Sequence, residues 1–358
     1  MKTKLLIFFI VIFGISFQIK AQKKTYYHDS TYYKSYNDFL HLRLYTVYKF
    51  NSLVVNSHDE QNNRRQLVYS PNGNINLGFG FNYKGLGINF GFNFPFINND
   101  DKTLGHTKKL DMRSYMYGRR YAIDFGLQFY KGFYLTEFDK VTRPNNPNPP
   151  SEIRGDLTIN TLGITAFKIQ NYEKFSFRAA FAQTEVQKKS AGSLIYGPYF
   201  NMVFTKADSS LVPEHIRDEF HISSNVIKGT YGSLGLIGGY AQSFVLGERF
   251  FLTGALAVGY GATYGNYTYT TDNGHVHDTT WKGGVKLNGR VAFGYNHGRN
   301  YIGTSYVIES YNITTNHDNI SMYWMGQFRI NLVRRFNWTV KPLDWLLARK
   351  REITSSKK

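Results

Sequence analysis

The sequence predicts an all-β protein whose strands close into an antiparallel transmembrane β-barrel, and three observations support this prediction. First, 28 Tyr, 29 Phe and 33 Gly make up about a quarter of the 358 residues, a composition typical of β-sheet rather than of a disordered or helical membrane chain. Second, apolar and polar residues alternate with period two in many short segments. Third, the connections between these segments are alternately short and long.

The N-terminal residues carry the pattern of an export signal. Lys2 and Lys4 precede a largely apolar stretch over residues 5–17, which is too short to span a bilayer as a helix because that needs about 20 residues. We expect residues 1–21 to be a signal peptide cleaved near Ala21, and residues 22–38 to be a periplasmic N-terminal segment. The chain has no cysteine, so lipoprotein processing, disulfides, thiolate metal sites and cysteine nucleophiles are excluded.

The clearest alternation lies in residues 74–96. Ile75, Leu77, Phe79 and Phe81 alternate with Asn and Gly, and the same pattern resumes after the pair Lys84-Gly85. Because successive strand side chains point to opposite faces, this hairpin has one apolar face and one Asn/Gly face. A water-soluble sandwich usually carries Lys, Glu and Thr on its outer face, so the pattern favours lipid outside and a polar lumen inside.

The same alternation, in places diluted by small residues, predicts ten further strands at 40–48, 121–129, 133–135, 157–169, 175–181, 231–242, 250–264, 285–295, 301–311 and 324–332. Together with the hairpin these make about twelve strands, within a range of ten to fourteen. If residues 194–205 also cross the membrane the count is thirteen, but single-chain bacterial barrels have even counts, which favours twelve.

The connections predict an orientation. Short ones are expected at Lys84-Gly85, Lys131-Gly132, 171–173, 247–248 and 297–299, and long ones at 52–72, 97–119, 139–156, 187–230, 265–282 and 312–320. Outer-membrane barrels have short periplasmic turns and long external loops. We therefore expect a barrel over residues 39–336 in the cell outer membrane, followed by a basic periplasmic tail at 337–358.

Several segments resemble a known family, namely 42–45 (LRLY), 69–72 (YSPN), 77–85 (LGFGFNYKG), 188–193 (KKSAGS) and 208–213 (DSSLVP). They are similar to an uncharacterised outer-membrane protein family of Bacteroidota-type bacteria, designated domain of unknown function 4421. The resemblance covers most of the chain after the signal peptide. It implies an outer-membrane barrel and supplies no activity, so no catalytic or ligand-binding residue follows from it.

Assigning the apolar face outward leaves a set of charged residues facing the lumen, namely Arg43, Asp124, Arg178, Lys286, Arg290, Glu309 and Arg329. Five cations against two acids predict an electropositive lumen. An open lumen of this kind favours anions. The alternative is that these residues pair and fill the barrel.

These observations favour a non-enzymatic channel, surface-binding or structural envelope protein, with outer-membrane lipid, lipopolysaccharide and small anionic solutes as its partners. The formal charge of +18 does not imply nucleic acid, because an exported chain meets acidic lipopolysaccharide instead. No cofactor is expected, and His275, His277 and Asp278 are weak metal ligands that are better explained as a polar external loop.

The alternative from another class is an outer-membrane acyl hydrolase. It would use a Ser/His pair from the 187–230 segment, drawn from Ser190, Ser193, Ser209, Ser210, His215 and His221. The sequence contains no Gly-x-Ser-x-Gly elbow. The non-enzymatic interpretation is therefore favoured.

Overall fold

The computed structural model describes residues 28–58, 64–73, 75–84, 86–94, 100–136, 152–316, 321–341 and 344. The predicted signal peptide, the proline run at 144–150 and most of the basic tail lie outside these residues. No helix in the described part of the chain has the length and apolar character needed to cross a membrane.

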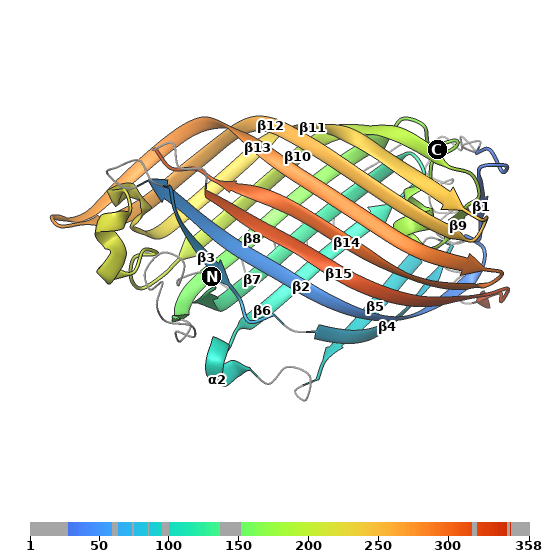
Figure 1. Ribbon diagram of the computed structural model, residues 1–358, viewed down its shortest axis with the longest axis horizontal. Coiled ribbons are helices and arrows are strands. Elements are labelled where there is room, and N and C mark those ends of the chain that lie inside the picture. The colour runs from blue at the N-terminus through green and yellow to red at the C-terminus, as the bar shows by residue number, and fades with distance from the viewer. Residues whose placement is uncertain are drawn as a thin grey trace, which may run out of the picture.

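Ten strands form a closed antiparallel ring (Figure 1), which confirms the predicted fold class. They are β2 (Leu40–His58), β3 (Arg64–Ser70), β7 (Tyr121–Leu135), β8 (Ile153–Ile169), β10 (Ala191–Lys206), β11 (Val226–Leu246), β12 (Phe250–Thr271), β13 (Gly274–His297), β14 (Asn300–Ile313) and β15 (Ser321–Phe336). The last strand pairs with the first from Phe336 opposite Leu40 to Met322 opposite Val54. This pairing closes the ring.

Three further strands join the sheet without entering the ring. β4 (Ile75–Tyr83) continues the line of β3 along β2, and β5 (Leu86–Asn93) pairs with β4 as the predicted hairpin. β6 (Lys108–Tyr117) pairs with β7. The thirteen-stranded sheet therefore contains a ring of ten strands, which lies within the predicted range of ten to fourteen but below the favoured count of twelve.

Side chains alternate between the outside and the inside of the barrel as the period-two pattern requires. On β12, Leu256 is 62% exposed on the outer face, whereas Ala257 is 1% exposed on the inner face. Aromatic pairs flank the outer apolar residues, with Tyr264 against Trp281 at one end and Phe250 against Tyr295 at the other. This is the surface expected of a barrel in a bilayer.

The two ends of the barrel differ. Short connections at Lys84, 118–120, 247–249 and 298–299 share one end with the N-terminal strand β1 (Tyr33–Ser35), and we call this the short-turn end. It lies on the right of Figure 1. The opposite, long-loop end carries residues 207–225 with the short helices η2 (Glu214–Glu219) and η3 (Ile222–Ser224).

Three sequence predictions are wrong in detail. Lys131-Gly132 is not a turn, because β7 runs through it with a bulge at which Gly132 has a φ of +94°. Residues 175–181 are not a strand but lead into η1 (Arg178–Ala182), a single helical turn inside the barrel. Residues 187–230 are not one loop, because β10 crosses the barrel within them.

Three other predicted loops also contain regular structure. Residues 97–119 include β6 and the short helix α2 (Asp101–Leu104), and residues 52–72 include the end of β2 and all of β3. Residues 265–282 are mostly the long β12–β13 hairpin, which extends past the outer aromatic pair.

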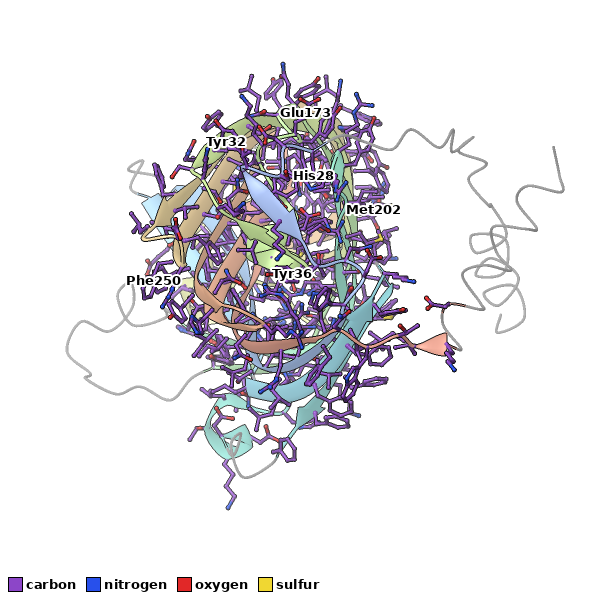
Figure 2. All side chains as sticks on the ribbon, turned by 90° about the vertical axis from the view of Figure 1, so that its right-hand side faces the viewer. His28, Tyr32, Tyr36, Glu173, Met202 and Phe250 are labelled. Atoms are coloured by element: carbon purple, nitrogen blue, oxygen red, sulfur yellow. The ribbon has the colours of Figure 1, made fainter. Side chains whose placement is uncertain are left out.

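Packed segments fill both ends of the barrel. At the short-turn end, residues 170–190 fold back into the mouth, where β9 (Glu185–Gln187) pairs with β1 and Phe175 and Phe177 are buried. Figure 2 looks at this end and shows β1 lying across the mouth close to Tyr36. At the long-loop end, Arg154 donates to the carbonyl of Ser210 at 2.7 Å and holds residues 207–225 over the opening.

Candidate functional site

The wall of the barrel has a gap between β5 and β6. Among the described residues, β5 pairs with β4 alone and β6 pairs with β7 alone. The ring closes at this point only through β3, which meets β7 at two residue pairs, Tyr69 with Leu135 and Ser70 with Tyr134. We call the unpaired region the β5–β6 gap. It lies on the short-turn side of the β3–β7 contact, because β5 and β6 are both adjacent to short turns.

Specific contacts bound the gap at both ends. Toward the long-loop end, the buried Asn72 side chain donates to Asp100, Asp101 and the Gly105 carbonyl at 2.9–3.1 Å. Toward the short-turn end, the Lys84 ammonium pairs with the Asp344 carboxylate at 2.6 Å. The backbone N–H of Lys84 donates a hydrogen bond to the Asn37 carbonyl. Hydrogen bonds and an ion pair therefore fix the structure at both ends of the gap.

A basic cavity lies behind the gap. It has a volume of about 400 Å³ and is lined by Arg43 of β2, Arg113 of β6, Arg178 of η1 and Arg329 of β15. Four separate elements thus bring four guanidinium groups to one cavity. No carboxylate is among the described residues that line it.

Two of these arginines have carboxylate partners. Arg113 pairs with Asp111 at 2.6 Å, and Arg178 pairs with Glu185 at 3.3 Å. Arg178 lies in η1, inside the barrel and outside its strands. Burial lowers the pKa of its guanidinium, and the Glu185 carboxylate opposes that shift. Because the ordinary pKa of arginine is above 12, Arg178 remains a cation at neutral pH.

Arg43 and Arg329 have no carboxylate within 4.0 Å in the described part of the chain. Arg43 instead donates to Gln183 Oε1 at 2.7 Å and to the Ala182 carbonyl at 2.9 Å, both within the segment that closes the mouth. Arg329 stacks on Tyr45, with 4.8 Å from its guanidinium carbon to the ring centroid. The Nε atoms of both arginines are buried without a hydrogen-bond partner.

Two of the four positive charges that line the cavity are therefore not balanced by a carboxylate of the described residues. Guanidinium groups bind planar oxyanions through two parallel hydrogen bonds, and they suit phosphate and carboxylate groups best. The chemistry of this lining is thus that of an anion-binding site.

The structure divides the predicted lumen residues into two groups. Lys286 pairs with Glu309 at 3.1 Å, and Arg290 pairs with Asp124; all four side chains are buried within the barrel. These two ion pairs help to fill the interior. The other three, Arg43, Arg178 and Arg329, line the basic cavity.

Sequence reasoning missed Arg113, because residues 97–119 were expected to form a loop. A signal was present, since Leu110, Met112 and Met116 alternate with Asp111, Arg113 and Tyr115 and are 50–54% exposed on the outer face.

The weak metal ligands do not converge. His275 and His277 lie on one exposed face of β13, whereas Asp278 points to the other face and accepts hydrogen bonds from Asn316 and Tyr267. Within the described residues, no group of three His, Cys, Asp or Glu side chains could hold a metal ion.

The Ser/His residues of the 187–230 segment are also separated. Ser193 is 2% exposed near the short-turn end of β10, and its hydroxyl accepts from the Asn171 N–H and donates to the Leu194 carbonyl. Ser190, just before β10, accepts from the Val245 N–H at the same end. At about 3.3 Å per residue, the rest of β10 places Ser193 about 40 Å from the loop that holds His215.

The loop serines and His221 have local structural roles. The Ser210 hydroxyl accepts from the Val212 N–H, and the Ser209 carbonyl accepts from Arg154. His221 caps η3 by accepting from the N–H of Ser223, a serine that is 2% exposed. The geometry therefore does not present an accessible serine beside a histidine at any of these positions.

Comparison with known proteins identifies the family. The profile of the domain of unknown function DUF4421 matches residues 27–336. The chain belongs to this family. The match extends from just before β1 to the last residue of β15, so it includes the whole ring, the gap and the basic cavity. No curated protein sequence matches the chain.

Solved structures with a similar outline are outer-membrane proteins. The outer membrane protease OmpT from Escherichia coli shares 9% identity over 85% of this chain and 98% of its own, with a TM-score of 0.38. A Pseudomonas aeruginosa FadL homologue shares 9% identity over 84% and 91%, with a TM-score of 0.22. The P. putida toluene transporter TodX shares 7% identity over 84% and 91%, with a TM-score of 0.19. Similarity at this level transfers no function to the DUF4421 chain.

Proposed function

We propose that this DUF4421 protein is a non-enzymatic outer-membrane β-barrel that binds an anionic group in the basic cavity and does not conduct along its axis. The observation that carries the proposal is the charge of the cavity, where Arg43 and Arg329 are half-buried, have no carboxylate partner among the described residues, and keep their buried Nε atoms without a hydrogen bond.

The outer surface supports a membrane location. Large apolar side chains such as Leu234, Leu236 and Leu256 are 60–71% exposed on the outer face, which would be unfavourable in water over so wide a surface. With the short-turn end in the periplasm, as in other outer-membrane barrels, the N-terminal strand β1 is periplasmic. That orientation agrees with export by a signal peptide cleaved near Ala21.

The packed interior argues against an axial channel. An apolar cluster that includes Leu53, Leu157 and Leu211 occupies the long-loop end, and one that includes Phe167, Phe175 and Phe177 occupies the short-turn end. Between them lie the ion pairs Lys286–Glu309 and Arg290–Asp124. An ion would have to displace both clusters to cross the barrel.

Two measurements test the proposal. In planar bilayers, the refolded protein should show no steady conductance, and anion-selective conductance would contradict the filled axis. In calorimetric titration of detergent-solubilised protein, inorganic phosphate should bind, and Arg329→Gln should weaken binding about tenfold or more, since a charge-assisted hydrogen bond contributes about 1.5–3 kcal/mol. Unchanged phosphate affinity in Arg329→Gln, or none in the unsubstituted protein, would contradict the cavity as the site.

A further inference from the structure

We infer that the natural occupant of the basic cavity is an anionic glycerophospholipid of the surrounding membrane, which reaches the arginines sideways through the β5–β6 gap. This inference rests on the proposed function, because it assigns the ligand class of the same cavity.

The two sides of the gap match the two halves of such a lipid. On the inner side lie the four arginines. On the outer side, Phe90 and Phe92 of β5 and Met112 and Met116 of β6 are 44–52% exposed. A molecule that fits both must have an anionic head and apolar tails, and a phospholipid has both. A small anionic solute would leave the apolar flanks unused.

Among the described residues, no strand pairs with the facing edges of β5 and β6, and these edges point to the same ligand. Strand edges carry backbone N–H and C=O groups, and each such group left without a partner in hydrocarbon costs several kcal/mol. Outer-membrane barrels avoid this cost by closing completely. A polar lipid headgroup with its water, seated in the gap, supplies hydrogen-bond partners to the facing edges of β5 and β6 that acyl chains alone would not.

The position of the gap selects the membrane leaflet. The cavity is lined by Asn82 and Gly118, which lie beside the short turns at Lys84 and 118–120. In the proposed orientation this is the periplasmic half of the bilayer, which contains glycerophospholipid, whereas lipopolysaccharide occupies the external half. The inference therefore commits to a phosphate-bearing phospholipid headgroup.

Lipid binding by the full-length mature protein tests the inference. The protein is refolded into phosphatidylcholine vesicles with a minor fraction of phosphatidylglycerol, extracted in detergent, and its bound lipids are counted by native mass spectrometry. We expect enrichment of phosphatidylglycerol, and a loss of about tenfold or more in the double variant Arg43→Gln/Arg329→Gln. The matched control is Arg249→Gln, which removes one exposed arginine of the 247–249 turn, away from the cavity, and should leave enrichment unchanged. Equal enrichment in the double variant and the control would overturn the inference.

Crosslinking tests the route without altering the arginines. The chain has no cysteine, so Phe90→Cys with Met112→Cys introduces the only two thiols, one on each side of the gap. Bridging them with a bismaleimide should slow exchange of a fluorescent-tailed phosphatidylglycerol several-fold. The matched control bridges Tyr240→Cys and Leu256→Cys, registered neighbours where the wall is already hydrogen-bonded, and should not slow exchange. Equal exchange rates in the two crosslinked proteins would overturn lateral access.

The outcomes separate the two proposals. Binding of inorganic phosphate without any preference for phosphatidylglycerol would refute the lipid and leave the anion site intact. Binding of neither would refute both.

Discussion

Leu256→Arg tests whether the outer surface faces hydrocarbon. Leu256 is 62% exposed and lies on β12, whose outward apolar residues run from Phe250 to Tyr260. It is six residues beyond Phe250, which is about 20 Å along a strand at 3.3 Å per residue. With a strand tilt of about 40°, it stands about 15 Å above the short-turn end, near the middle of an apolar band about 25 Å tall.

The expected cost depends on depth. An arginine on the lipid face costs about 2–4 kcal/mol at the bilayer midplane and about 0–1 kcal/mol near an interface. Leu246→Arg is the matched control, because Leu246 is 59% exposed and ends β11 beside the turn at Gly247. We expect Leu256→Arg to lower the free energy of unfolding by about 2 kcal/mol or more relative to Leu246→Arg.

The assay is reversible folding into phospholipid vesicles, with a guanidinium titration followed by the fluorescence of the four tryptophans. If the barrel were surrounded by water, both substitutions would be surface changes worth within about 0.5 kcal/mol of each other. Equal midpoints for the two variants would therefore refute the membrane assignment of the outer face.

Three further predictions concern the interior. Asp124→Ala should lower the free energy of unfolding by about 3–5 kcal/mol, because it leaves the buried Arg290 unpaired, and Arg290→Met in the same chain should recover most of that loss in the same titration. Phe177→Ala removes a ring that is 1% exposed, so residues 170–190 should lose hydrogen-exchange protection; unchanged protection would show that this ring does not hold the segment in the mouth. Ser193→Ala should leave hydrolysis of a chromogenic ester at the background rate of the unsubstituted protein, and a measurable activity lost in the variant would restore the hydrolase alternative.

The strands that could be predicted from the sequence are those with an apolar outer face and a polar inner face. In β13, apolar residues face out and Lys286 and Asn288 face in, so the alternation is plain, whereas small residues dilute it in β12. The crossing of residues 194–205, which is β10, was only the alternative, because an even strand count argued against it and its alternation is weak: Ile195 and Val203 face inward into the two apolar clusters while Leu194 and Phe204 face outward. A strand that is apolar on both faces has no period-two signal.

The prediction of a turn at Lys131-Gly132 was wrong for a physical reason. A positive φ is used in a bulge as well as in a turn, and a side chain at Gly132 would also clash with the carbonyl oxygen of His106. The local sequence Lys-Gly is the same in both cases. Only the continued pairing of Phe133 with Arg154 distinguishes them, and that contact is distant in sequence.

The site could be predicted in part. Parity placed Arg43 and Arg329 on the inner face, but it could not show which interior cations lack a partner. That depends on long-range register, since Asp124 meets Arg290 from 166 residues away. The gap was beyond sequence reasoning as well, because it consists of a pairing that β5 and β6 do not make.

The distribution of charge inside the barrel supports the proposal that the cavity is its functional region. Burying a cation costs several kcal/mol unless a partner offsets the loss of water, and the barrel meets this requirement at Lys286 and Arg290 with a carboxylate each. Arg43 and Arg329 have no such carboxylate in the described part of the chain, and the buried Nε atom of each lacks a hydrogen-bond partner. These two arginines line the cavity behind the β5–β6 gap, where we propose that an anionic group from the membrane reaches them. In the proposed complex, one phosphate headgroup relieves the unbalanced charge and the unpaired edges together, whereas an explanation by folding stability alone leaves both as costs.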